Sequence, residues 1–529
     1  MIIAAGLAAL AAAAVTVANP PTCPEPEPGA AAGSTVDRIE VDRRGIFDEH
    51  DGRLSWPYRL VDRLHARTRE AVIRRELLVA AGDCTDAEAL AQTERNLRGT
   101  GFLRDARVET VPASSGGAGA VDVRVSTFDT WTTVPHLRLA QVGNRRVWTL
   151  GIGERNLFGR GQRVEIQRRS DIDRDQTLVS FLDPRVAGSR VQAFVSLADR
   201  SDGRRGELLV ERPFFALTTA WSFRARVEAF DQLDPLYQDG ERVADLAHDG
   251  RALDLEGAHS VLRTATGALR LHAAYRRRHD RVAEDLRQFG IAEAGLSFVQ
   301  HRYLRLTHVN RFERAEDFNL GHQLSTAVGL SLPALGGGKG TALFVTASVR
   351  KGLAIGPERF LLGDVAWTGR HRTGTWENAI ADTRLSAAVR LTRRSLLLTQ
   401  AHYRHGSNLD PETQIAIGAQ NGLRGYAVNQ WTGTRSLLLA GEARLFIADE
   451  VAKILSFAAA AFAETGYAWP MGSKVARHDL RGDVGLGLMI GRNRLTARPL
   501  RIDVAYAFDP PPGRSRWQVS AGVQFSFVE

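Results

Sequence analysis

The chain has 529 residues, of which 44% are hydrophobic and 24% are charged, and its formal net charge is +9. These proportions are close to those of soluble proteins, and after the first twenty residues no apolar run approaches the ~20 residues that a membrane-spanning helix needs. The composition therefore excludes a helical membrane protein but leaves a transmembrane β-barrel open, because barrel strands alternate apolar and polar residues.

The positive charge comes mostly from arginines that are scattered along the whole chain. No basic stripe with interleaved aromatic residues is present, which argues against nucleic acid as a partner. We expect most of these arginines to be solvated in a lumen, at a rim and in loops. Some of them would face the phosphates of lipopolysaccharide.

The N-terminal segment is typical of an exported protein. Residues 1–18 are predicted to be a signal peptide, because residues 2–18 are apolar and end in the small residues of a cleavage site. Residues 19–33 are rich in Pro, Ala, Gly and Glu and are predicted to form a linker. Since an exported chain reaches an oxidising compartment, Cys23 and Cys84 could pair.

Residues 34–128 have the pattern of a small α+β domain. The expected order is a strand around Val36–Val41, a helix over Thr68–Leu78, a second helix opened by the capping box Thr85–Glu88, and strands at Ala106–Val111 and Ala120–Val125. A sheet built in this order offers an edge to which an extended peptide can add.

From residue 129 to residue 529 the helical periodicity gives way to strand-like segments between polar turns. In the last segment, one face carries Trp517, Val519, Ala521, Val523, Phe525 and Phe527. The opposite faces of such segments hold Arg, Asp, Glu and Gln, which predicts lipid on one side of the strands and water on the other. Lipid forbids open sheet edges, so we predict an all-β transmembrane barrel of about 16 antiparallel strands.

Four motifs stand out in this sequence. They are Gly422-Leu423-Arg424-Gly425-Tyr426, the segment Phe462–Gly466 with Glu464 at its centre, the turn Asn156–Gln162, and the aromatic final strand with Trp517, Phe525 and Phe527. In this order, and after the α+β segment, they resemble the POTRA-plus-barrel outer-membrane superfamily (bacterial surface antigen type), which includes BamA, TamA and the two-partner-secretion transporters. Glu464 stands where the superfamily usually has Asp, and the turn resembles one that follows the first barrel strand.

The resemblance implies that Arg424 lies at the tip of a long outer loop that folds back into the lumen. An anchored loop needs a partner, and a guanidinium group binds carboxylates through several donors. Gly422 and Gly425 supply the permissive backbone of a tight tip. Alternation places Glu442 on the lumen face, whereas it does not settle the facing of Glu464. We expect Arg424 to pair with Glu442, Glu464 or both; the alternative is an exposed turn with an incidental arginine.

Motifs for chemistry are absent from the sequence. Gly340 follows Lys339 where a phosphate loop needs Ser or Thr, and no dinucleotide, hydrolase or zinc-protease motif appears. The chain is therefore predicted not to be an enzyme, and no cofactor or metal site is expected.

Function is inferred mainly from the resemblance. It implies a protein of the Gram-negative outer membrane, with its POTRA-like domain in the periplasm, that inserts polypeptides into that membrane or passes them across it. A weak seam between the first and last barrel strands would pair with client strands. Expected partners are unfolded or secreted polypeptides, outer-membrane lipid and lipopolysaccharide, and a periplasmic or inner-membrane protein. The alternatives are a two-partner-type secretion pore and a passive channel or surface antigen.

Overall fold

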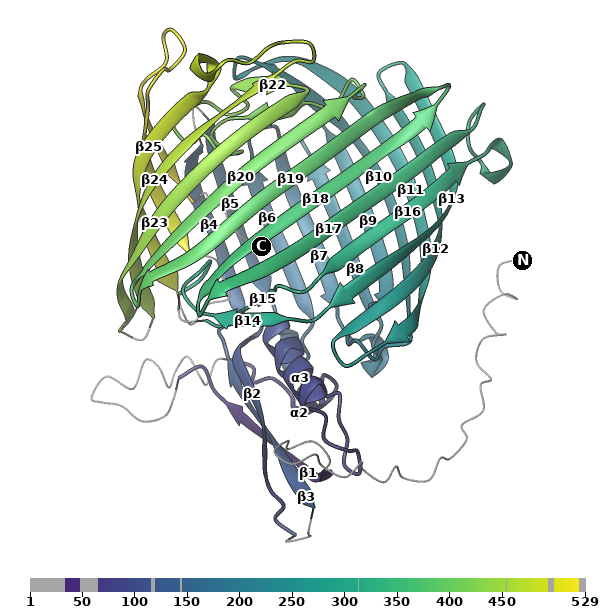
Figure 1. Cartoon of the computed structure of the whole chain (residues 1–529), viewed down its shortest axis with the longest axis vertical. Helices are drawn as coiled ribbons and strands as arrows, with labels where there is room; N and C mark the ends of the chain where they lie inside the picture. The colour runs from purple at the N-terminus through teal and green to yellow at the C-terminus, as the bar shows by residue number, and fades with distance from the viewer. Residues whose placement is uncertain are drawn as a thin grey trace.

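The structure is a computed structural model that describes residues 34–47, 65–115, 119–142, 145–312, 314–452, 454–492 and 499–522. A wide β-barrel carries a small domain at one end (Figure 1). We call the barrel end at this domain the near end and the opposite end the far end. The predicted signal peptide and linker, with Cys23, and the aromatic residues Phe525 and Phe527 lie outside the described residues. Cys84 is described and is disulfide-bonded.

The N-terminal domain is a three-stranded sheet packed against two helices. Its elements are β1 (Thr35–Arg44), α2 (Glu70–Arg74), α3 (Ala87–Gly99), β2 (Leu103–Pro112) and β3 (Ala120–Asp129). β3 lies in the centre, parallel to β1 and antiparallel to β2. Val72 and Ile73 of α2 and Leu97 of α3 pack on Val36 and Val123 of the sheet. The order strand, helix, helix, strand, strand is the predicted one.

The first helix is shorter than predicted, because both of its flanks are held by side chains. Before α2, the backbone N–H and the hydroxyl of Thr68 donate to the Asp129 carboxylate at 2.9 and 2.8 Å. After α2, the N–H of Leu78 donates to the Thr93 hydroxyl at 3.1 Å instead of continuing the helix. Tertiary contacts therefore replace helical hydrogen bonds at both ends.

The start of the second helix also differs by one residue from the predicted capping box. Asp86 is the N-cap, and its side chain accepts the N–H of Glu88 at 2.9 Å. Thr85 is instead buried, and its N–H donates to the carbonyl of Ser34 at the start of the sheet.

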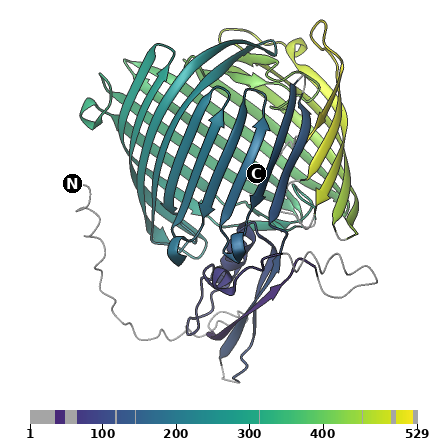
Figure 2. The same ribbon diagram turned by 180° about the vertical axis from the view of Figure 1, so that it is seen from behind.

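The barrel is a single closed antiparallel sheet (Figures 1 and 2). Its strands are β4 (Thr133–Val142), β5 (Arg145–Glu154), β6 (Arg163–Ser170), β7 (Asp175–Asp183), β8 (Gln192–Arg200), β9 (Gly203–Arg212), β10 (Trp221–Gln238), β11 (Glu241–Arg263), β12 (Gly267–Val282), β13 (Asp285–Gln300), β16 (Gln323–Ser331), β17 (Ala342–Gly356), β18 (Arg359–Arg372), β19 (Thr375–Thr392), β20 (Ser395–Ser407), β23 (Arg435–Val451), β24 (Leu455–Trp469), β25 (Arg481–Arg492), β26 (Leu500–Ala507) and β27 (Trp517–Ala521). Each strand pairs with the next, and β27 meets β4 to close the barrel. Short 3-10 turns occur at Leu157–Gly159, Val186–Gly188, Pro333–Leu335 and Arg477–Asp479.

Side chains alternate between the two faces of the barrel wall as predicted. On β23, Leu439 is 42% exposed on the outside, whereas Glu442 is 1% exposed and Arg444 is buried beside it on the inside. An apolar outer face with polar residues inside is what a surrounding hydrocarbon layer requires. Within the described residues, no helix has the length and apolar character needed to cross a membrane.

Two predictions about the barrel were wrong. The described residues place twenty strands in it, more than the predicted about 16, because most of the connections are tight turns that use few residues. The turn Asn156–Gln162 follows β5, the second barrel strand, and not the first. β4 and β5 have ten residues each and are separated only by residues 143 and 144, so one more strand than predicted precedes this turn.

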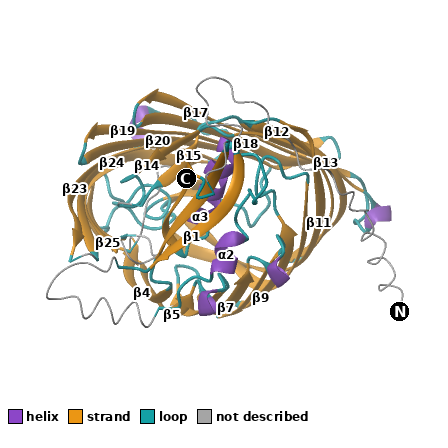
Figure 3. Cartoon of the chain, turned by 90° about the horizontal axis from the view of Figure 1, so that it is seen from below, coloured by secondary structure: helices purple, strands orange, loops and turns teal. Residues whose placement is uncertain are grey.

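Two segments enter the lumen from opposite ends. Residues 301–322, which we call the near segment, connect β13 to β16 and contain the hairpin of β14 (Tyr303–Leu306) and β15 (Glu316–Asn319). Residues 408–434, which we call the far loop, connect β20 to β23 and contain β21 (Ile415–Ile417) and β22 (Trp431–Gly433). Seen from below, the N-terminal domain lies across the near end (Figure 3).

Candidate functional site

The tip of the far loop carries the predicted arginine motif into the lumen. Gly422 has a φ of +129°, which favours glycine, and a Cβ there would overlap the side chain of Leu438. A Cβ on Gly425 would lie only 2.8 Å from the Cβ of Asp483. The flanking Leu423 and Tyr426 are buried in the lumen core. The two glycines let the tip approach the wall closely enough for the side chain between them to reach it.

Arg424 is buried, and three carboxylates surround its guanidinium group. Nε donates to Glu464 Oε1 at 2.9 Å, and Nη1 lies 3.0 Å from Glu442 Oε2 and 3.3 Å from Asp503 Oδ2. The backbone N–H of Arg424 donates to the second oxygen of Glu464 at 2.9 Å. The guanidinium carbon also lies 3.5 Å from the ring centroid of Phe462, the first residue of the motif that contains Glu464.

Two more arginines extend this arrangement along the wall. Arg501 donates through Nη1 and Nη2 to the two oxygens of Glu442, at 2.8 Å each, and through Nε to Asp503 at 2.7 Å. Arg444 Nε donates to Glu442 at 2.7 Å, and its Nη1 donates to the carbonyl of Val309. Because Val309 belongs to the near segment, this network connects both lumen segments to the wall.

We call this network the lumen cluster; it comprises Arg424, Glu442, Arg444, Glu464, Asp483, Arg501 and Asp503. It holds four carboxylates and three guanidinium groups. Asp483 is the carboxylate for which the described residues provide no arginine partner. Its Oδ2 accepts the N–H of Gly425 at 2.9 Å, while its buried Oδ1 has no hydrogen-bond partner among them. Glu464 lies opposite Asp483 across β24 and β25, and their carboxyl groups are within hydrogen-bond reach, so the two acidic groups either repel each other or share a proton.

The structure brings together the predicted residues Gly422 to Tyr426, Glu442 and Glu464. Both carboxylates contact Arg424, so neither of the two expected pairings is exclusive. The sequence interpretation missed Arg444, Asp483, Arg501 and Asp503. Arg501 and Asp503 could have been found, because they alternate with the outward-facing Ile502 and Val504 of β26.

The predicted seam is described only in part. Trp517 begins β27 and is 61% exposed on the outer face, with its ring 5.0 Å from that of Tyr506 on β26. β27 pairs with β26 from Trp517 to Ala521 and adjoins β4 at the closure of the barrel. The first and last barrel strands therefore meet at this position.

The turn Asn156–Gln162 holds the N-terminal domain against the barrel. Asn156 is fully buried; its Nδ2 donates to the Thr68 hydroxyl at 2.9 Å, and its Oδ1 accepts the N–H of Gly161 at 2.7 Å. A Cβ on Gly161 would lie 3.1 Å from the ring of Phe102. This motif thus forms a close-packed joint between the domain and the second barrel hairpin.

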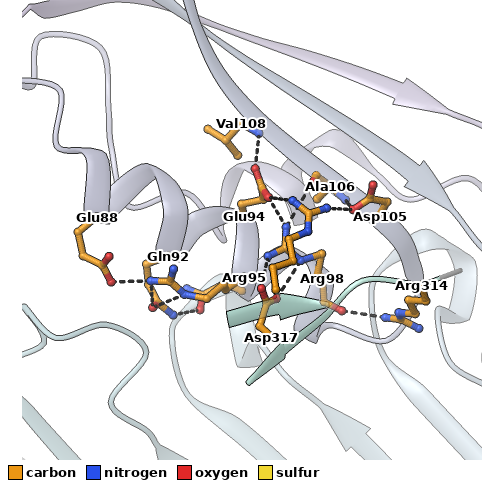
Figure 4. Close-up of polar contacts among 12 residues, drawn as sticks. Glu88, Gln92, Glu94, Arg95, Arg98, Asp105, Ala106, Val108, Arg314 and Asp317 are labelled. Carbon is orange, nitrogen blue, oxygen red and sulfur yellow. Dashed lines mark hydrogen bonds and ion pairs between the residues drawn. The ribbon is translucent and has the colours of Figure 1, made fainter. Parts of the chain in front are cut away.

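A second contact joins α3 to the near segment (Figure 4). Arg98 donates through Nη2 to both oxygens of Asp317, at 2.7 and 3.0 Å, and it also pairs with Glu94. Arg305 of the near segment reaches Glu94 at 3.0 Å, and Arg314 donates to the carbonyl of Arg98 at 2.9 Å. These contacts fix α3 to the near end of the barrel.

The similarity of this chain to known proteins is limited. No family model matches the chain. In an alignment 205 residues long, which covers 34% of this chain, the sequence is 26% identical to outer membrane protein assembly factor BamA of Nitratidesulfovibrio vulgaris, and the match spans only 25% of that protein. Among solved structures, BamA from Haemophilus ducreyi lacking POTRA domains 1–3 is 12% identical with a TM-score of 0.41, covering 93% of this chain and 85% of that one. CdiB from Acinetobacter baumannii is 12% identical with a TM-score of 0.45, covering 92% and 73%.

The closed barrel with its apolar outer face defines a transmembrane β-barrel protein. The homology to BamA supports an outer-membrane location. This partial similarity to BamA agrees with the resemblance that the sequence motifs indicate.

Proposed function

We propose that the chain inserts polypeptides into the Gram-negative outer membrane, or translocates them across it, with its N-terminal domain acting as a periplasmic POTRA domain. The order of the domain's sheet supports this role, because β2 lies at an edge where an extended client can add as a further strand. In this orientation the near end of the barrel faces the periplasm and the far loop lies on the cell exterior.

The observation that carries the proposal is the filled lumen. Phe312 of the near segment and Leu423 of the far loop belong to one buried core together with Leu438 and Phe446 of the wall. The lumen cluster adds hydrogen bonds from the same two segments to the wall. A lumen filled in this way disfavours a passive channel. It favours a mechanism in which client polypeptides pass through the barrel wall.

The seam between β27 and β4 is the part of the wall best suited to this route. Only there are the neighbouring strands the first and last of the barrel, so the two can separate without stretching a connecting turn. An opened seam presents unpaired backbone groups that a client strand can bind. The client's own folding would drive the process, and neither a catalytic centre nor a cofactor is required.

Site-specific cross-linking during client assembly tests the proposal. A photoreactive residue at position 517 should capture nascent outer-membrane proteins. The same residue at position 255 is a matched control, because Leu255 is also on the outer face, 43% exposed, on the distant strand β11. Equal capture at both positions, or none at either, would contradict a seam route. Capture only from a lumen-facing position such as Arg276, which pairs with Glu293 inside the barrel, would identify a two-partner-type secretion pore instead.

A further inference from the structure

A cavity of about 680 Å³ lies between the N-terminal domain and the near end of the barrel. Its walls come from α2, α3, the near segment and the connections that precede β6, β8 and β10. Apolar side chains, including Val72, Phe102 and Phe215, line part of it. A volume of this size accommodates a ligand much larger than a simple ion, since pockets for organic ligands measure about 300–1,000 Å³.

The remainder of the lining is strongly basic. Six arginines and three carboxylates contribute to it, and all three carboxylates are already engaged. Glu76 pairs with Arg185, and Asp317 pairs with Arg98. Glu316 Oε1 accepts three consecutive backbone N–H groups of the near segment, at 3.3, 2.9 and 3.2 Å.

Three of the arginines therefore have no carboxylate partner among the described residues. Arg163 donates to the carbonyl of Thr100, and its buried Nε has no hydrogen-bond partner there. Arg314 donates to the carbonyl of Arg98. The side chain of Arg311 makes no hydrogen bond or ion pair in the described part of the chain, although its charge acts on the buried Glu316. We call Arg163, Arg311 and Arg314 the vestibule arginines.

Their surroundings favour an incoming negative charge. Burial, together with repulsion from Arg311 and Arg155, outweighs the attraction of Glu316 and Asp105 and lowers the pKa of Arg314 to about 10. A carboxylate bound among these groups would replace the lost water and offset the repulsion, because guanidinium groups bind carboxylates through paired, charge-assisted hydrogen bonds.

We propose that the vestibule arginines bind aspartate and glutamate side chains of an unfolded polypeptide as it passes from the N-terminal domain to the barrel. The proposal rests on the proposed function and names the client chemistry that this junction selects. A polypeptide fits better than a free anion, because acidic and apolar side chains along one extended segment match basic and apolar walls within one cavity.

The test measures binding of short, dye-labelled extended peptides to the full chain in detergent micelles. Three peptides share the same apolar residues and alternate them with Glu, Gln or Lys. The Glu peptide should bind tightest. Arg311→Gln and Arg314→Gln should each weaken its binding by about tenfold, the loss expected for one charge-assisted contact, and should leave the Gln peptide unaffected. Arg160→Gln, which alters an exposed arginine of the neighbouring turn, is the matched control and should bind all peptides like the wild type.

Equal binding of the Glu and Gln peptides, or unchanged binding of the Glu peptide by Arg311→Gln, would overturn the proposal. Arg311 donates no side-chain hydrogen bond within the described residues, so Arg311→Gln is expected to fold, and its melting temperature checks this. Competition by inorganic phosphate without any preference among the peptides would identify a small-anion site and would also overturn the proposal. Peptide binding is measured without client assembly, so a chain that binds the Glu peptide but assembles no client would refute the proposed function alone.

Discussion

Neutralising Asp483 and neutralising Glu464 should have opposite effects, although the two residues lie opposite each other on β25 and β24. Glu464 accepts two hydrogen bonds from Arg424, from the backbone N–H and from Nε, each at 2.9 Å. Glu464→Gln removes one charge of a buried pair, which typically costs about 3–5 kcal/mol of stability. Asp483 has only the N–H of Gly425 as a donor among the described residues.

Asp483→Asn retains an oxygen that accepts the Gly425 N–H, and its amide group supplies a hydrogen-bond donor to the carboxylate of Glu464. It also removes the contact between two acidic groups, so the variant should be at least as stable as the wild type. Because the predicted effects differ by several kcal/mol, unfolding by guanidinium chloride in detergent micelles will resolve them. Asp199→Asn, at a 76% exposed side chain, controls for the loss of a negative charge. If Asp483→Asn destabilised the barrel as much as Glu464→Gln, the conclusion that Asp483 is the surplus acidic group of the lumen cluster would be wrong.

Three further predictions concern the loop tip and the near end. Arg424→Glu should prevent formation of the heat-resistant barrel on a gel. Adding Glu464→Arg should restore it only partly, because two other carboxylates still face position 424. Wild-type behaviour of the single variant would exclude an anchoring role. Gly422→Ala should lower stability by about 1–3 kcal/mol, since the residue has positive φ and no room for a Cβ, and an unchanged unfolding midpoint would contradict this. Arg98→Gln should speed hydrogen exchange around Asp317 without changing that of the barrel strands. Equal protection in the variant and the wild type would show that this ion pair does not hold α3.

The sequence predicted well those features that depend on local periodicity. The alternation along Leu437–Phe446 correctly placed Glu442 inside the barrel, because successive residues of a strand point to opposite faces of the sheet. The facing of Glu464 was not predictable, since Phe457–Ala463 is apolar on both faces. The structure shows why: Ala458, Ala460 and Phe462 are all buried on the inner face, and Ala458 belongs to the apolar core that fills the lumen, so the usual polar inner face is missing there.

Features that depend on contacts between distant segments were not predictable from the sequence. The shortened α2 results from Thr68 and Asp129, which are neighbours only after the domain folds. The sequence of the near segment has the composition of a polar loop. No local pattern in it indicates that Val309 and Phe312 are buried in the lumen. Likewise, alternation along β26 can give the face of Arg501, but its partner Glu442 lies on a strand that is not adjacent.

The near segment links two regions that sequence motifs alone treat as separate. Asp317 binds Arg98 on the N-terminal domain, while the carbonyl of Val309 accepts a hydrogen bond from Arg444 in the lumen cluster. The short stretch between these residues is itself fixed, because Glu316 binds the backbone of Val309 to Arg311. A displacement of α3 away from the barrel must therefore either break the Arg98–Asp317 pair or draw Val309 away from Arg444. In the second case the guanidinium group of Arg444 would lose a buried acceptor, which costs about 1–3 kcal/mol or more, and the position of the N-terminal domain would be coupled to the stability of the lumen cluster.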